Sequence, residues 1–254
     1  MWKWIRISAL LAILLSVATG EWLAQRRLWS WQRSATVAIY PIIGDDSPST
    51  RRYVQGLTNA GYADLEQFFA DEAGRYALPL SHPVTVRVYP GPVTAPPAPP
   101  PRSQGLGVVW WSLRLRYYAW RMSGIGDGQI RVYVIFHDGH RLPSLPHSMG
   151  LQRGHIGVVH AFAAAYMAGT NNFIIAHEIL HTLGAQDLYD PATNLPLLPD
   201  GLGDPSQQPL YPQQFAEVMA GRRLLGPGQA ETPESLAECL IGPRTAEQIH
   251  WLHR

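Results

Sequence analysis

The sequence is organised around one stretch, His177-Glu178-Ile179-Leu180-His181-Thr182-Leu183-Gly184-Ala185-Gln186-Asp187, which follows the apolar run 173–176. In a helix, His177 and His181 lie four residues apart on one face, so both imidazoles can reach a single metal ion. Glu178 lies one position round the helix, close enough to polarise a water molecule at the metal without being a ligand. Two neutral imidazoles suit Zn²⁺, which at a catalytic site takes a third protein ligand and keeps one position open for water.

The third ligand is expected just after this helix. Gly184 lies three residues beyond His181, where a glycine with positive φ can end a helix and turn the chain. The chain can then double back and present Asp187 to the same metal. The pattern HExxHxxGxxD resembles the metzincin zinc proteases, most closely the small secreted bacterial members with aspartate as third ligand. The resemblance implies that His177, His181 and Asp187 bind Zn²⁺. It also implies that Glu178 is the general base.

A second stretch fits the same resemblance. Metzincins place a methionine in a tight turn beneath the metal, and residues 215–221, Phe-Ala-Glu-Val-Met-Ala-Gly, are the matching segment. Met219 in that role provides an apolar floor for the imidazoles and is not a ligand. As an ordinary core residue, Met219 would only fill space.

The remaining elements are predicted from hydrophobic patterning. Alternation and β-branched residues predict strands over 36–41, 83–89, 130–136 and 153–161. Helices are predicted over 51–78, broken near 59–61, over 108–122, and over 233–240 and 245–253. In metzincins a strand just before the active-site helix is an antiparallel sheet edge that pairs with extended substrate, and 153–161 is the segment in that position.

The resemblance implies an α+β fold, with a mixed twisted sheet, a zinc-binding active-site helix and a small, mostly irregular or helical C-terminal subdomain. We expect residues 34–254 to form one zinc protease domain, with an upper subdomain over 34–184 and a lower one over 185–254. Residues 90–102 are proline-rich and predict a surface insertion.

Residues 1–33 carry the targeting information. Lys3 and Arg6 precede an apolar run over 7–18, and residues 18–20 form a small-x-small cleavage site. Read as one helix through Ala24, the run has the length of a short membrane span. Tryptophans flank the run, as interfacial anchors do: Trp2, Trp4, Trp22, Trp29 and Trp31. We predict an uncleaved membrane anchor with a periplasmic or extracellular catalytic domain, and a cleaved secretion signal is the alternative.

Composition narrows the function classes. Residues 1–33 hold five of the 20 basic residues and one of the 19 acidic residues, so the remainder is mildly acidic and no nucleic-acid partner is expected. Cys239 is the single cysteine, which excludes an internal disulfide. The sequence leaves open the substrate specificity, the oligomeric state, and the roles of His155 and His160. The aromatic and basic segment 108–122 has two interpretations, a helix packed into the domain or one resting on a membrane surface.

Three functions follow from these residues. The first is a zinc endopeptidase that hydrolyses protein or peptide substrates, with Glu178 as general base. The second is a zinc hydrolase of gluzincin type, whose third ligand is Glu217. The third is a non-catalytic metal-binding domain, against which Glu178 argues because a structural metal has no use for an adjacent base.

Overall fold

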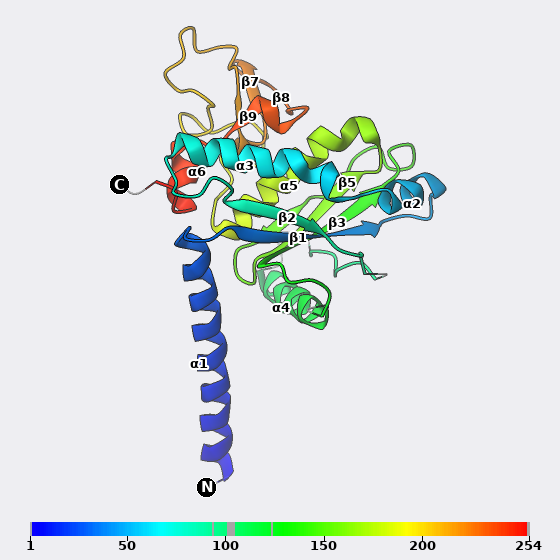
Figure 1. Cartoon of the computed structure of the whole chain (residues 1–254), viewed down its shortest axis with the longest axis vertical. Helices are drawn as coiled ribbons and strands as arrows, with labels where there is room; N and C mark the ends of the chain where they lie inside the picture. The colour runs from blue at the N-terminus through cyan, green and yellow to red at the C-terminus, as the bar shows by residue number, and fades with distance from the viewer. Residues whose placement is uncertain (1, 93, 101–104, 123, 253–254) are drawn as a thin grey trace.

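The computed structural model describes residues 2–92, 94–100, 105–122 and 124–252. A five-stranded mixed sheet forms its centre, in the order β2-β1-β3-β5-β4 (Figure 1). The strands are β1 Ala35–Ile43, β2 Val84–Val88, β3 Ile130–His137, β4 Met149–Leu151 and β5 Ile156–Phe162. The first three and β5 are mutually parallel, and β4 pairs antiparallel with β5. The chain is thus a mixed α/β protein, compatible with the α+β class.

The inner strands are nearly continuous apolar runs because helices cover both faces of the sheet. On one face lie α3 Ala63–Arg75 and α5 Ala168–Leu183, and on the other lies α4 Gly105–Arg121 (Figure 1). Because alternate side chains of β1 point to opposite faces of the sheet, this strand contributes to two hydrophobic cores. Val37 and Ile39 pack with the α3 and α5 side, while Tyr40 and Ile42 pack with the α4 side. The short helix α2 Pro48–Gln55 and the turn η1 Asn59–Tyr62 precede α3, so the predicted break near 59–61 is confirmed.

The prediction of the sheet edge was wrong. The predicted strand 153–161 is β5, which is parallel to β3 and lies inside the sheet. The antiparallel edge is β4, a three-residue strand in a segment for which no strand was predicted. Its brevity and its single glycine leave no alternating pattern from which it could be recognised.

The C-terminal part contains strands as well as irregular chain. The chain between Asp187 and Pro212 is irregular, as predicted for this part, and it also contains isolated β-bridges that were not predicted. Two small sheets follow, one of β6 Ala216–Glu217 with β9 Cys239–Leu240, the other of β7 Arg223–Gly226 with β8 Gln229–Glu231. The turn η3 Val218–Ala220 follows β6.

The prediction of a helix over 233–240 was wrong. Only the three-residue turn η4 Leu236–Glu238 forms there, because the chain becomes extended at Cys239 to pair with β6. The last predicted helix is present as α6 Pro243–Gln248, and residue 253 lies outside the described residues. The predicted insertion 90–102 is irregular where it is described, which excludes residues 93, 101 and 102.

The helix α1 Trp2–Trp29 projects from the domain, but its end is tied to it (Figure 1). Trp29 Nε1 donates to the Leu183 carbonyl at 2.7 Å, and Trp31 Nε1 donates to the Ile249 carbonyl at 2.8 Å. In the described parts of the chain, no helix has both the length and the apolar character needed to cross a membrane. The membrane anchor over residues 1–33 stays a prediction.

Candidate metal centre

The helix α5 ends where the sequence predicts. Gly184 has φ +117°, and its N–H donates to the carbonyls of Leu180 and His181, which closes the last turn. A side chain there would be strained by this φ, and its Cβ would lie 2.9 Å from Gln152 Nε2. The chain therefore reverses at Gly184 and returns along the exposed side of α5.

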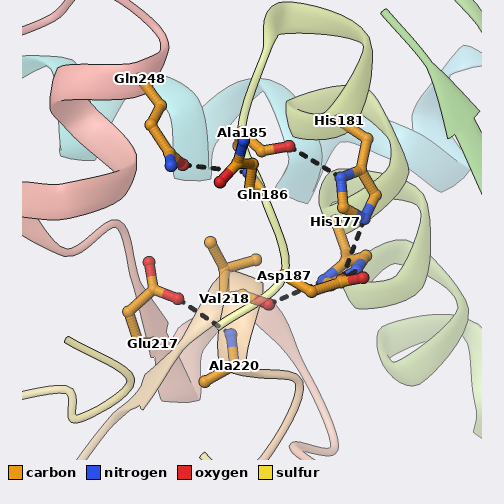
Figure 2. Close-up of polar contacts among 9 residues, drawn as sticks. All are labelled: His177, His181, Ala185, Gln186, Asp187, Glu217, Val218, Ala220 and Gln248. Carbon is orange, nitrogen blue, oxygen red and sulfur yellow. Dashed lines mark hydrogen bonds and ion pairs between the residues drawn. The ribbon is translucent and has the colours of Figure 1, made fainter. Parts of the chain in front are cut away.

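Three donor atoms converge beyond this turn. His177 Nε2 and His181 Nε2 lie 3.2 and 3.1 Å from Asp187 Oδ1 (Figure 2). The ligand atoms of these three residues lie within 4.8 Å of one another. Tetrahedral Zn²⁺ with bonds of 2.0–2.1 Å requires ligand atoms about 3.3 Å apart, so the spacing to Asp187 suits it. The structure thus brings together the three residues that the resemblance implied as ligands.

The other imidazole nitrogens are held by backbone carbonyls. His177 Nδ1–H donates to the Val218 carbonyl at 3.0 Å, and His181 Nδ1–H donates to the Ala185 carbonyl at 2.9 Å (Figure 2). A carbonyl can only accept, so the proton is fixed on Nδ1 and the Nε2 lone pair of the neutral ring points at the site. This arrangement is typical of histidines that bind a metal.

The loop that carries Asp187 is fixed from two sides. Gln186 N–H donates to Gln248 Oε1 of α6 at 3.0 Å (Figure 2). Leu188 N–H donates to the Met219 carbonyl at 2.9 Å. Neither contact is predictable from the sequence, because both join segments that are distant along the chain.

His177 and Asp187 of the site shift each other's pKa values. Burial opposes protonation of His177, but its hydrogen bond with Asp187 and the charge of Glu178 outweigh burial and raise the pKa of His177 to about 9. Burial also opposes ionisation of Asp187, yet its hydrogen bonds with the two histidines hold its pKa well below the ordinary value. A divalent cation would replace the proton on His177 and satisfy the same carboxylate.

Glu178 lies beside the ligands with one oxygen unsatisfied. Glu178 is 4% exposed, and its Oε2 is buried without a hydrogen-bond partner among the described residues. Burial raises the pKa of Glu178, while the neighbouring histidines and the Gly150 N–H oppose that rise. An unpartnered carboxylate oxygen next to a metal site is suited to accept a hydrogen bond from a water molecule.

Gly150 of β4 brings the sheet edge against α5. A Cβ at this position would lie 2.5 Å from the Glu178 carbonyl oxygen and from the His181 Cβ, and 3.2 Å from Glu178 Oε2. Only glycine allows this approach. Sequence reasoning missed Gly150, since an isolated glycine outside a recognised strand carries no signal by itself.

A cleft of about 370 Å³ opens over these groups. Its walls come from β4, from His160 of β5, from α5 and from the Asp187 loop with Tyr189. A second pocket of about 330 Å³ adjoins it and shares the following wall residues: His147, Ile174, His177 and Tyr189. The sequence did not single out His147 or Tyr189 as site residues.

The segment 215–221 forms a tight turn beside the site. Met219 is fully buried within η3, and Gly221 follows with φ +74°. The turn reaches the metal centre through the Val218 carbonyl, which holds His177. The role of Met219 as a floor for the imidazoles stays a prediction, because its side chain belongs to the same core as other apolar residues of α5.

The carboxylate of Glu217 forms its hydrogen bonds away from the three candidate ligands. Its Oε2 accepts from Ala220 N–H at 2.9 Å, and its Oε1 accepts from Gly242 N–H at 3.1 Å and Thr245 Oγ1 at 2.6 Å. Figure 2 shows this carboxylate on the side of the turn away from the histidines. Among the described residues, the group that could hold a metal ion includes Asp187 and does not include Glu217.

The two histidines of open role lie outside the ligand group. His155 Nδ1 lies 3.0 Å from the Thr182 carbonyl. His160 Nδ1 lies 2.9 Å from His137 Nε2, and His160 also lines the cleft.

Comparison with known proteins adds no assignment: no family model matches the chain, and no curated protein matches its sequence. The chemistry of the site is therefore argued from its own residues. They can hold one divalent cation by three ligands and place a buried carboxylate beside it.

Proposed function

We propose that the protein is a zinc-dependent endopeptidase of metzincin type. The observation that carries the proposal is the convergence of His177, His181 and Asp187 in the cleft that also contains the unpartnered Glu178 oxygen. Two imidazoles and one carboxylate form a donor set that suits Zn²⁺ at a catalytic site.

Each residue of the site has a task in peptide hydrolysis. A zinc ion held here supplies Lewis acidity toward a carbonyl oxygen and a water molecule. Glu178 Oε2 takes a proton from the attacking water and then carries it to the leaving amine. The raised pKa of Glu178 favours the first of these transfers, because a more basic carboxylate accepts a proton more readily. The carbonyls of Val218 and Ala185 keep the imidazole rings in place throughout.

The position of β4 supports a peptide as substrate. It is the last strand of the sheet, so its outer side has no strand partner among the described residues, and its Met149 and Gly150 line the cleft. An extended peptide can add to such an edge by backbone hydrogen bonds, which hold any sequence across the catalytic groups. The predicted N-terminal anchor and extracytoplasmic location belong to the same proposal.

The test combines zinc content with proteolysis on the full chain in detergent. We expect about one zinc per chain in the parent, by elemental analysis, and marked loss in Asp187→Ala. Asp200→Ala is the matched control, because Asp200 is an exposed carboxylate in the following loop, and it should retain zinc. Glu178→Gln should keep zinc and lose casein or peptide-library cleavage by about a hundredfold or more.

Each part can fail separately. Stoichiometric zinc in Asp187→Ala would remove Asp187 from the ligand set. Unchanged cleavage by Glu178→Gln would exclude this residue as the base. A folded parent with zinc and no cleavage of any peptide would leave a metal-binding domain in place of an enzyme.

A further inference from the structure

The helix α4 has an exposed aromatic face that the proposed zinc site does not use. One side of the helix packs on the sheet through Trp111, Leu115 and Ala119, all of them buried. The opposite side exposes four large residues at helical spacing: Trp110 (65%), Leu113 (51%), Tyr117 (60%) and Trp120 (67%). We call these four residues the aromatic stripe. The buried face confirms that segment 108–122 packs into the domain, and the exposed face is the part of α4 to which the second interpretation, contact with a membrane surface, applies.

The stripe is bordered by arginines. Successive residues of an α-helix are 100° apart, which places Arg114 and Arg121 along one side of the stripe and Arg116 along the other. Arg114 and Arg121 are exposed, and within the described chain neither forms an ion pair. No acidic residue occurs between Glu72 and Asp127, so nothing nearby in sequence balances this positive charge.

The position of α4 in the molecule points to what covers the stripe. The helix α1 projects from the domain on the same side of the sheet as α4 (Figure 1). Its exposed side chains include Trp4, Leu11 and Trp22. The contacts of Trp29 and Trp31 with the domain fix where α1 leaves it. Thus α1 and α4 both carry exposed tryptophan and leucine side chains, and both lie on the same side of the sheet.

We propose that the aromatic stripe of α4 rests on the surface of a lipid bilayer with anionic headgroups. Tryptophan and tyrosine favour the boundary between headgroups and acyl chains, and flanking arginines bind lipid phosphates. An anionic membrane provides negative charge opposite the exposed arginines. A protein partner would need an acidic surface of its own to do the same. The proposal does not rest on the zinc site, and it adds the domain itself to the membrane contact that is predicted for residues 1–33.

The test places a fluorescent label on the stripe of the full chain. Tyr117→Cys provides the labelling site, and Arg51→Cys, on the exposed side of α2, provides the matched control. Both are made with Cys239→Ser, which removes the native thiol. The labelled chains are reconstituted into vesicles of phosphatidylcholine and phosphatidylglycerol at about 2:1. Each label is then exposed to a nitroxide-bearing lipid and, separately, to aqueous iodide.

The label at position 117 should be quenched by the nitroxide lipid, and its quenching by iodide should be at least about threefold weaker than at position 51. Adding Arg114→Gln and Arg121→Gln, or raising the salt concentration, should reduce the lipid quenching. Equal iodide access at both positions would overturn the proposal. Protection of position 117 from both quenchers would also overturn it, because the stripe would then be covered by protein. Lipid quenching that ignores the arginines would exclude their assigned role.

Discussion

His160 is the residue of the cleft wall whose ionisation is coupled to a second histidine. Its Nδ1 lies 2.9 Å from His137 Nε2, and the rings stack with centroids 5.2 Å apart. Burial, assisted by the nearby His137, lowers the pKa of His160 to about 4. Burial lowers the pKa of His137 as well, although Asp45 opposes that shift. Two adjacent imidazoles cannot both gain a proton without repulsion, so the folded protein keeps this pair neutral.

The pair should make stability depend on pH. The folded-state pKa of His160 lies below the ordinary value, so the unfolded chain binds the proton first as the pH falls. The contribution of His160 to the free energy of unfolding is therefore complete above about pH 6.5, and it is lost as the pH falls toward about 4. Between about pH 7.5 and about pH 5, His160 should account for a loss of about 2 kcal/mol in the free energy of unfolding. Urea unfolding at both pH values measures it. His160→Gln should flatten the dependence, and His140→Gln, at an exposed histidine, should not. An equal loss in parent and His160→Gln would contradict the assignment.

At the scale of elements, the turn η3 depends on the buried carboxylate before it. Glu217 caps η3 through Ala220 N–H and joins it to the start of α6 through Gly242 and Thr245. The next residue, Val218, supplies the carbonyl that holds His177. Glu217 therefore supports the metal site through the backbone and without coordinating.

Glu217→Gln tests this supporting role. The amide keeps the shape but replaces one acceptor oxygen by an NH₂ group, which faces a backbone N–H in either orientation. The free energy of unfolding should fall by about 2 kcal/mol, and zinc should still bind at one per chain. Chemical denaturation and elemental analysis measure the two quantities. Thr245→Val, which removes one donor and keeps both oxygens bonded to the backbone, should cost less. Loss of zinc from a folded Glu217→Gln protein would contradict the expectation that zinc binding does not require the Glu217 carboxylate.

The elements of the site differ in how far the sequence could predict them. The helix with His177 and His181, the stop at Gly184 and the return to Asp187 depend on local spacing, and the structure has all three. The edge strand β4 depends on pairing with β5, and β9 depends on pairing with β6 across more than twenty residues. Such pairing overrides local preference, which is why Cys239 lies in a strand where a helix was predicted.

At the scale of the whole molecule, residues near the two ends of the described chain share one core. Trp31 is 3% exposed, bonds to the Ile249 carbonyl 218 residues later, and packs edge-on against Trp251 with ring centroids 5.5 Å apart. Trp29 lies over His250, with ring centroids 4.1 Å apart. The final turn of the predicted anchor segment is thus continuous with the packing around α6.

Trp31→Ala should remove this junction. It deletes a buried aromatic ring and its hydrogen bond, so the free energy of unfolding of the detergent-solubilised chain should fall by about 3–5 kcal/mol. Trp22→Ala, at an exposed tryptophan of α1, should change it by less than about 0.5 kcal/mol. A fragment that begins at Ser34 should lose at least as much stability as Trp31→Ala, because it also lacks buried Leu28 and the hydrogen bond of Trp29. Equal stability of Trp31→Ala and the parent would show that the contacts of Trp31 with Ile249 and Trp251 do not stabilise the domain.

Contacts between segments that are distant in sequence also determine how late in synthesis the site can be completed. The strand β1 leaves the ribosome long before β2 and β3, its partners in the sheet, so its apolar faces must wait for later chain. The proposed ligands His177, His181 and Asp187 follow, then the Val218 carbonyl, and last the residues of α6 that bind Glu217 and Gln186. A nascent chain that stops before residue 242 has the three proposed ligands but not the contacts with α6 that support them. On the proposed function, proteolytic activity would therefore arise only after nearly all of the described chain has been made.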